Sequence, residues 1–509
     1  MDNLLLNTLV RNMESARLRA LANQPNSIRR YYAADFNVLT MADGYKYSQF
    51  LQIPEDTSYI SSYIESRAGG VFDKLFCVDF QPLLIEFLSR RLTRDMVEYM
   101  RVFCNNYGVL FNYNGFLDIV EKLDGYWPLH IRALPEGLVV DPGVVLVDIE
   151  PTIEEYSFAA SWVETMTLRS AWYGSTVGTI SYRIRKLLET ALDETSDLVP
   201  GSMEYNVVLA YMLNDFGARG ASSPETARLG GLAHLLSGFR GTDNTEAVHA
   251  ATKYYHEGAG TAGNTACASE HSTASLQGKS GEVDFNNLMI KRFGHLPFFA
   301  TVIDSFDPIE NVRDNWCGTN KQAVLEMNAR LVLRPDSGYP PEMALAIIEE
   351  LGKAYGFTVN SKGYKVLNSK VRVIYGDGID EEMIDKIYQA LKAAGWSIEN
   401  ICFGMGGALL QKCDRDWMRF AQKTNETEFG GIRHEVQKLP TSDPTKASKL
   451  GRHTTLFDTE TNRIFSIPQK NIGQDQYKDC IEILVSVFKD GIVIRDYSMV
   501  EIRELALVQ

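Results

Sequence analysis

Residues 396–412 read WSIENICFGMGGALLQK, a stretch in which a short apolar run, a glycine-rich turn and the beginning of a helical pattern follow one another. The same order recurs several times between about residues 205 and 415. The other apolar runs end in NDFGARG (214–220), RGTDN (240–244), DSFD (304–307), RPDSG (334–338) and GDG (376–378). A succession of strand, loop and helix predicts a parallel sheet covered by helices. With this many units we expect an α/β fold with an irregular, closed or nearly closed parallel barrel, whose strand-end loops build an active site.

The sequence on either side of this region carries signals of antiparallel strands. Residues 130–149, HIRALPEGLVVDPGVVLVDI, contain two turn clusters, and Asp490-Gly491 separates two apolar runs in IEILVSVFKDGIVIRDY (481–497). An Asp-Gly pair in that position is a hairpin signal. We therefore expect a discontinuous antiparallel α+β domain built from the N- and C-terminal parts. The predicted division is a helical extension at 1–34, the antiparallel domain at 35–150 with 416–509, bridging helices at 151–200 and the barrel at 201–415.

The composition is that of an ordinary globular protein, with 45% hydrophobic and 23% charged residues among 509. A formal net charge of −14 argues against a general binder of nucleic acid, so any phosphate must be bound by a local cluster. No apolar run reaches the ~18 residues of a membrane span. The seven cysteines are dispersed and form no C-x-x-C pair, which indicates reduced thiols in a cytoplasmic protein. We expect neither nucleic acid nor membrane as a partner.

Several common motifs are missing from the sequence. QGKSG (277–281) ends like a phosphate-binding P-loop, but Thr273 stands where the first glycine is required. No G-x-G-x-x-G follows a predicted strand, and no H-E-x-x-H occurs. These observations disfavour nucleotide hydrolysis by a P-loop, dinucleotide binding by the usual fold, and zinc proteolysis.

The strand-end loops carry groups suited to a phosphorylated sugar. The glycine-rich turn at 404–407 opens into a helix, and backbone N–H groups at such a turn can approach a phosphate. Carboxylates at several strand ends suit ribose hydroxyls or a hydrated Mg²⁺ ion. Taken singly, each residue can also be read as part of a tight connection or a turn. The polar residues concerned are Asp215, Asp243, Asp304, Asp307, Asp336, Asp377, Arg219, Arg240 and Arg334.

Taken together, these loops resemble one family, the nicotinamide phosphoribosyltransferases, which are type II phosphoribosyltransferases. Further matching stretches are ADGYKYSQF (42–50), YIESR (63–67), SEHSTAS (269–275), KGYKVL (362–367) and SDPTKASKLGR (442–452). The matches keep a consistent order from about residue 35 to the C-terminus. No single motif is specific, whereas the ordered set is.

The resemblance implies a reaction and an assembly. The family joins nicotinamide to 5-phosphoribosyl 1-pyrophosphate, which gives nicotinamide mononucleotide and pyrophosphate in NAD salvage. Mg²⁺ and ATP are the implied cofactors, and ATP hydrolysis stimulates the reaction through a phosphohistidine. The implied assembly is a homodimer with shared active sites.

The resemblance also assigns substrate-binding residues. Phe216 would stack on one face of the pyridine ring, and the partner subunit's Tyr45 would cover the other. Asp243 would accept a hydrogen bond from the carboxamide nitrogen. Nicotinate would instead bring a carboxylate against Asp243, at a cost of about 4 kcal/mol for charges ~4 Å apart at an effective dielectric of ~20. The remaining implied contacts are Arg219 near the substrate, Arg334 in the nucleotide pocket, Asp336 and Asp377 with Gly376 at the ribose, and Gly406 and Gly407 beside the 5′-phosphate.

Two further groups follow from the same resemblance. His271 matches the histidine that ATP phosphorylates, and Asp307 matches the carboxylate that would fix its tautomer. Asp336 is also expected to be catalytic, and no residue is assigned as a direct metal ligand. The implied pyrophosphate-binding residues are Arg67, Arg415, Lys423, Lys438 and Lys446.

Three positions depart from the family pattern. Ala218 replaces an aromatic residue, Met405 a small polar residue, and Ala421 a serine. Two other functions remain open at this point. One is a nicotinate-preferring phosphoribosyltransferase of the same fold, against which Asp243 argues. The other is a catalytically idle dimer that binds nucleotides, against which the intact set of acidic residues and His271 argues.

Overall fold

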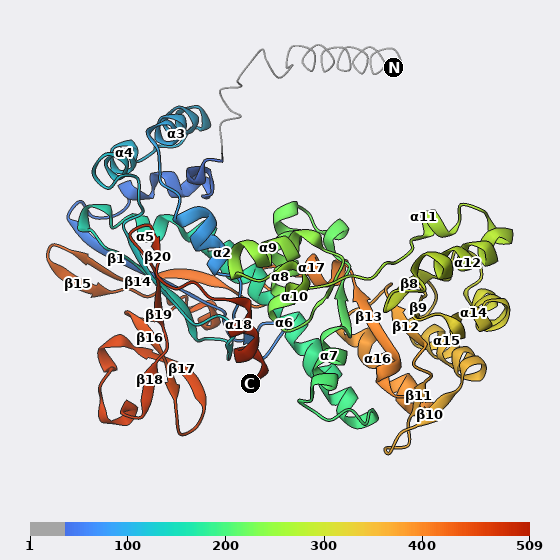
Figure 1. The fold of residues 1–509 in the computed structure, drawn as a ribbon. Coiled ribbons are helices and arrows are strands. Elements are labelled where there is room, and N and C mark those ends of the chain that lie inside the picture. Colours follow the sequence, from blue (N-terminus) through green and yellow to red (C-terminus); the bar gives the residue numbers. More distant parts are fainter. Residues whose placement is uncertain (1–35, 509) are drawn as a thin grey trace, which may run out of the picture.

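The computed structural model describes residues 36–508. Six parallel strands in the middle of the chain form one curled sheet, in the order β7-β6-β13-β12-β9-β8 (Figure 1). Each strand lies directly before, or at the start of, one of the polar loops singled out in the sequence, and all neighbouring pairs are parallel. The strand bounds are β6 Leu213–Asp215, β7 Gly241–Thr242, β8 Phe298–Val302, β9 Arg330–Arg334, β12 Val371–Tyr375 and β13 Ile401–Met405.

The chain between residues 264 and 269 joins the two edge strands of this sheet. Asn264 forms a parallel bridge with Gly241 of β7, and Ala268 forms one with Ala300 of β8. Backbone hydrogen bonds of 2.8 to 3.2 Å accompany both bridges. The irregular parallel α/β barrel expected from the sequence is therefore confirmed, with irregular chain in place of a strand on one side.

The barrel helices begin where polar side chains cap them. Ser223 accepts a hydrogen bond from the Thr226 N–H at 3.1 Å and starts α8, and Asp380 accepts one from the Met383 N–H at 3.0 Å and starts α16. The helices of this region are α8 Pro224–Leu236, α9 Thr245–Tyr255, α10 Ala259–Ala262, α11 His271–Ala274, α12 Glu282–Phe293, α13 Pro308–Glu310, α14 Lys321–Glu326, α15 Pro340–Tyr355, α16 Glu381–Ala393 and α17 Gly407–Leu410. A small hairpin of β10 Phe357–Val359 and β11 Lys365–Leu367 follows α15.

Strands from both ends of the chain form one antiparallel sheet of seven, in the order β15-β14-β1-β5-β3-β19-β20. The Asp490-Gly491 hairpin is confirmed, because it joins β19 and β20, which pair antiparallel. The strands are β1 Thr57–Glu65, β3 Leu129–Ala133, β5 Val145–Pro151, β14 Ala421–Phe429, β15 Ile432–Glu435, β19 Val485–Lys489 and β20 Ile492–Val493.

Smaller elements surround this sheet. Helices α2 Gln81–Leu83, α3 Arg94–Tyr107 and α4 Tyr113–Lys122 precede β3, and α18 Met499–Leu507 ends the described chain. β2 Leu75–Phe76 pairs with β4 Val139–Val140, and β16 His453–Asp458 pairs with β17 Arg463–Pro468 and β18 Cys480–Glu482.

One long helix, α6 (Glu164–Thr195), lies between the antiparallel sheet and the barrel (Figure 1). The Thr167 hydroxyl donates to Gln422 Oε1 of β14 at 2.6 Å, and the Tyr173 hydroxyl donates to the Leu410 carbonyl of the barrel at 2.8 Å. The shorter helices α5 Ala159–Trp162 and α7 Met203–Ala210 flank it.

The predicted domain boundaries stay a prediction, and the predicted helical extension at 1–34 lies outside the described residues. Among residues 36–508, none of the helices is long and apolar enough to cross a lipid bilayer.

Candidate active site

The aromatic ring predicted to hold the base lies at the end of β6. Phe216 directly follows this strand, and the guanidinium carbon of Arg334, the last residue of β9, lies 5.1 Å from the centre of the ring. Gly404 of β13 leaves room for the ring, because a Cβ added there would lie 2.0 Å from Phe216 Cε2. The ring is thus placed between a cation and a strand position without a side chain.

A buried carboxylate organises the turn that carries this ring. Asp215 is fully buried and accepts hydrogen bonds from the Gly217 N–H at 2.8 Å and from Asn244 Nδ2 at 3.0 Å. Burial raises the pKa of Asp215 to about 6, because the loss of water outweighs these two bonds, and the nearby Asp243 adds to the rise. The carboxylate therefore ties the ends of β6 and β7 together.

Asp243, the predicted acceptor for the base, follows β7 directly. Its N–H donates to the carbonyl of Asp215 at 3.0 Å, and its exposed carboxylate accepts a hydrogen bond from the Thr265 hydroxyl. Phe216 and Asp243 therefore follow two neighbouring strands whose ends are held together by Asp215.

The residues predicted at the ribose also lie close together. Arg334 Nη2 donates to Asp336 Oδ1 at 2.9 Å. Gly376 packs on this pair, since a Cβ there would lie 3.1 Å from Asp336 Oδ1 and 3.2 Å from Arg334 Nε. Asp377 next to it is exposed. Within residues 36–508 the buried Nε of Arg334 has no hydrogen-bond acceptor, which leaves a donor for a ligand oxygen.

The carboxylate that contacts His271 is Asp304, and this corrects the expectation of Asp307. His271 Nε2 lies 2.8 Å from Asp304 Oδ1, and the Asp304 side chain is only 2% exposed. Its other oxygen accepts from the Asp336 N–H at 3.0 Å. Asp307 instead accepts from the Glu310 N–H at 2.9 Å as the N-cap of α13, so its carboxylate is engaged in starting that helix.

The glycines predicted at the phosphate lie at the same end of the barrel, directly after β13. Gly406 precedes the first residue of α17, Gly407, and a Cβ added to Gly220 would lie 3.6 Å from Gly407 Cα. Arg219, beside Gly220, is exposed. Met405, one of the departures from the family pattern, turns its side chain into the core, where it is 2% exposed.

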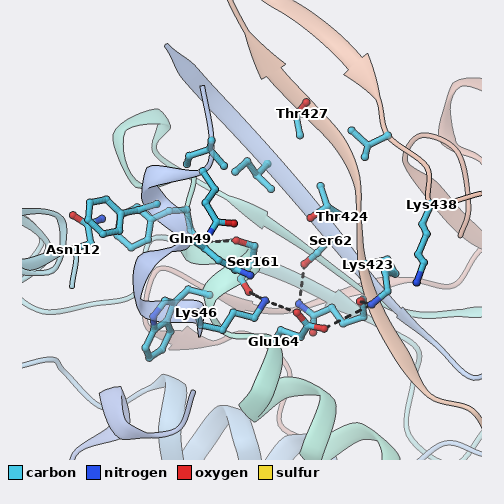
Figure 2. A pocket seen from close by; sticks show the side chains of 18 of the residues that line it. Lys46, Gln49, Ser62, Asn112, Ser161, Glu164, Lys423, Thr424, Thr427 and Lys438 are labelled. Atoms are coloured by element: carbon cyan, nitrogen blue, oxygen red, sulfur yellow. Dashed lines mark hydrogen bonds and ion pairs between the residues drawn. The ribbon is translucent and has the colours of Figure 1, made fainter. Parts of the chain in front are cut away.

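Most of the predicted pyrophosphate residues lie in the antiparallel domain, and Arg415 lies between α17 and β14. Lys423 of β14 and Lys438, just after β15, line a cavity of about 470 Å³ that also contains Lys46 (Figure 2). Ala421, another departure, is 9% exposed at the start of β14. The other three basic residues are paired with neighbouring carboxylates: Arg67 with Glu65 at 3.3 Å, Arg415 with Asp416 at 2.9 Å, and Lys446 with Asp443 at 3.3 Å.

Tyr45 also lies away from the barrel site. Tyr45 is 59% exposed in the 3₁₀ helix η2 (Gly44–Leu51), and within the described residues its ring makes no contact with Phe216. Tyr45 and Arg415 border a second cavity of about 500 Å³. A single chain therefore assembles the barrel part of the predicted site, while Tyr45 and the basic residues face elsewhere.

The carboxylates near the ribose residues would suit a magnesium ion that a substrate phosphate also binds. The part of the chain that the structure describes holds no cluster of three or more histidine, cysteine or acidic side chains arranged for a metal. Mg²⁺ typically keeps several waters and takes one or two carboxylates together with substrate phosphates. Asp336 and the exposed Asp377 are the carboxylates placed to contribute.

Two supporting residues, Asn244 and Thr265, were not predicted from the sequence, and Asp304 was predicted only as one of the strand-end carboxylates. Asn244 and Thr265 carry no local signal of their roles, because they act through contacts made by folding. Asp304 had a usable signal, since it is the first charged residue after the apolar run FFATVI (298–303).

Comparisons with known proteins agree with this architecture. Residues 211–469 match the nicotinate phosphoribosyltransferase (NAPRTase) family, and residues 37–131 match the N-terminal domain of nicotinamide phosphoribosyltransferase. The chain is 38% identical over 468 residues to a nicotinamide phosphoribosyltransferase of Xanthomonas campestris pv. campestris, covering 92% of this chain and 97% of that protein. It is 30% identical over 454 residues to one of Mycoplasma pneumoniae, covering 81% and 94%.

Solved structures share the fold at low sequence identity. A nicotinate-nucleotide pyrophosphorylase from Pyrococcus furiosus is 15% identical with a TM-score of 0.59, over 95% of this chain and 98% of that one. Human nicotinic acid phosphoribosyltransferase is 16% identical with a TM-score of 0.54, over 92% of each chain.

The fold is that of the type II phosphoribosyltransferases, and the expected enzyme class is confirmed. Within that class, the chain belongs to the nicotinate phosphoribosyltransferase family.

Proposed function

We propose that the protein transfers the phosphoribosyl group of 5-phosphoribosyl 1-pyrophosphate to nicotinamide, forming nicotinamide mononucleotide and pyrophosphate for NAD salvage. The observation that carries the proposal is that Phe216 and Asp243 follow neighbouring strands and that Asp215 makes hydrogen bonds at both strand ends. A flat ring beside an exposed hydrogen-bond acceptor suits a pyridine carboxamide. The names of the relatives from Xanthomonas and Mycoplasma support the same base.

In this reaction the pyridine nitrogen attacks the anomeric carbon of the sugar. The bond from that carbon to the pyrophosphate oxygen breaks, and pyrophosphate leaves with the electron pair. Phe216 would hold the base in line for attack. Asp336 and Asp377 would accept hydrogen bonds from the ribose hydroxyls, and the N–H groups at Gly406 and Gly407 would face the 5′-phosphate. Mg²⁺, when bound, would supply positive charge that stabilises the departing pyrophosphate.

His271 is the proposed phosphoryl acceptor from ATP. Because an ionised Asp304 can only accept, the ring nitrogen Nε2 carries the proton and Nδ1 keeps its lone pair. Attack of Nδ1 on the γ-phosphorus would form a nitrogen–phosphorus bond as the bond to the bridging oxygen breaks and ADP leaves. The buried Asp304 would then stabilise the cationic ring.

A homodimer would complete the site. The exposed Tyr45 and the neighbouring Arg415 border the same cavity, and a second copy of the chain would be needed to bring them to a barrel site. Light scattering that gave the mass of one chain for fully active protein would exclude this assembly. The seven free cysteines support the proposed cytoplasmic location, which cell fractionation would test.

The main alternative is a preference for nicotinate, because the matched family and the human structure are named for that base. Purified protein is incubated with phosphoribosyl pyrophosphate, Mg²⁺ and either base, with and without ATP, and the mononucleotide is measured by chromatography. We expect faster synthesis with nicotinamide and stimulation by ATP. Faster turnover of nicotinate would overturn the choice of base, and no product with either base would favour the idle nucleotide-binding dimer.

A further inference from the structure

A buried lysine holds one oxygen of a carboxylate beside the proposed pyrophosphate residues. Lys46 of η2 is 5% exposed, and its ammonium donates to the Ser161 carbonyl at 3.0 Å and to Glu164 Oε2 (Figure 2). Glu164 is the first residue of α6, and its side chain is 23% exposed at the wall of the cavity. Lys46 therefore fixes Glu164 from the protein side of the cavity.

The other oxygen of this carboxylate points toward Lys423. Glu164 Oε1 lies 3.9 Å from Lys423 Nζ, which is at the limit of an ion pair and beyond hydrogen-bond distance. The Lys423 ammonium instead donates to the carbonyl of the preceding residue at 2.6 Å. Figure 2 shows Glu164 between the two lysines, with Lys438 on the far side of Lys423. Lys423 therefore makes its hydrogen bond to the backbone and not to Glu164.

The charges around Lys423 are unbalanced. Burial lowers the pKa of Lys423, Glu164 opposes this, and Arg67, Lys438 and Lys46 lower it further. Three cationic groups therefore act on the Lys423 ammonium, and Glu164, which Lys46 already contacts, is the carboxylate that opposes them. A phosphate group entering the cavity would relieve the repulsion among them and would compete with Glu164 for the Lys423 ammonium.

We propose that Glu164 occupies the position beside Lys423 that a phosphate group of the substrate would take. Lys46 holds Glu164 back, so that Lys423 can turn to that phosphate. The inference rests on the proposed function, in which Lys423 binds the pyrophosphate group of the donor. Both Lys46 and Glu164 are positioning residues that set the donor affinity. If the Lys46–Glu164 pair only fastens η2 to α6, removing either partner destabilises the fold and affects both substrates alike.

Two substitutions separate these possibilities because they act in opposite directions. Lys46→Met releases Glu164 to pair fully with Lys423, so the KM for phosphoribosyl pyrophosphate rises. The expected rise is roughly two- to fivefold, which corresponds to the free energy of a partly exposed ion pair. Glu164→Gln removes the competing charge, so this KM falls by a similar factor. The double variant resembles Glu164→Gln, and the KM for nicotinamide is unchanged in all three.

Pyrophosphate binding measured by calorimetry gives a readout that does not need turnover. We expect weaker binding for Lys46→Met and tighter binding for Glu164→Gln. Lys353→Met and Glu350→Gln form a matched control, because this pair on α15, with Lys353 exposed and Glu350 partly buried, is joined at 2.7 Å and lies outside the cavity. If Lys46→Met does not fold, the Glu164→Gln titration alone decides the matter.

Shifts of both variants in the same direction, or equal effects on the two substrates, would overturn the inference. Wild-type protein that binds pyrophosphate but forms no mononucleotide would overturn the proposed function instead, and the opposed shifts in pyrophosphate binding would still be measurable. The two failures are therefore distinguishable.

Discussion

Replacing Gly404 by alanine tests whether the position of the Phe216 ring controls use of the base. The new methyl carbon would lie 2.0 Å from Phe216 Cε2, whereas carbon atoms in contact stay about 3.5–4.0 Å apart. β13 is hydrogen-bonded on both sides, to β12 and to β6, so its backbone cannot yield easily. The ring must therefore move by roughly 1.5 Å.

Such a displacement affects one substrate more than the other. Loss of the stacking contact alone, ~0.5–1.5 kcal/mol, corresponds to a factor of about two to twelve. A misplacement of ~1 Å in the reacting geometry can cost on the order of a hundredfold. We expect kcat/KM for nicotinamide to fall between these limits and the KM for phosphoribosyl pyrophosphate to change much less. Overpacking should also cost about 1–3 kcal/mol of unfolding free energy.

Steady-state kinetics with each substrate varied, together with urea unfolding, measure these effects. Gly260→Ala is the matched control, because a Cβ at that position meets no atom within 4 Å. In a Phe216→Ala background, Gly404→Ala should add no further loss, since the ring it displaces is gone. Unchanged kcat/KM for nicotinamide in Gly404→Ala, or an equal loss in the Phe216→Ala background, would refute the reasoning.

Three further predictions follow from the site. Asp243→Asn should reduce the preference for nicotinamide over nicotinate. The reduction should be about fivefold if the two charges interact through water and about a thousandfold if they are partly desolvated. An unchanged ratio of the two kcat/KM values would contradict the assigned role. His271→Ala should abolish ATP stimulation and leave basal synthesis, and Asp304→Asn should weaken the stimulation, as measured with and without ATP; equal stimulation in parent and His271→Ala removes that role. Asp215 has a folded-state pKa of about 6 against an ordinary 3.8, so the folded protein favours the protonated side chain. The resulting contribution to the unfolding free energy is fully present below pH ~4 and is lost as the pH rises toward and past 6. Relative to Asp215→Asn, wild type should gain about 1 kcal/mol of unfolding free energy between pH 7 and pH 5, and a constant difference would show that burial does not perturb this carboxylate.

The barrel could be predicted from sequence because its signals are local and repeated. Each polar loop follows a short apolar run, and parallel strands present their carboxyl ends at one edge, so the order of the loops was enough. The Asp490-Gly491 hairpin was equally readable, since φ values of +50° and +84° are those that the Asp-Gly pair favours in a tight turn.

The choice between Asp304 and Asp307 could not be made from the strand pattern alone. Both follow β8 within a few residues, and only the path of the backbone decides which one turns toward His271. One local clue did exist, because Asp307 precedes Pro308, and a capping residue followed by proline marks a helix start. The contacts of Lys46 with Glu164 had no such clue, since the two residues lie far apart in the chain and meet only when η2 packs on α6.

The position of β1 inside the antiparallel sheet, between β14 and β5, has a consequence for synthesis on the ribosome. One edge of β1 pairs with β5, but its other edge waits for β14, which emerges only after the whole barrel. At ~5–20 residues per second the nascent chain carries this bare edge for some tens of seconds. Exposed strand edges recruit other chains, so the segment after the barrel determines when a new molecule stops needing protection from aggregation.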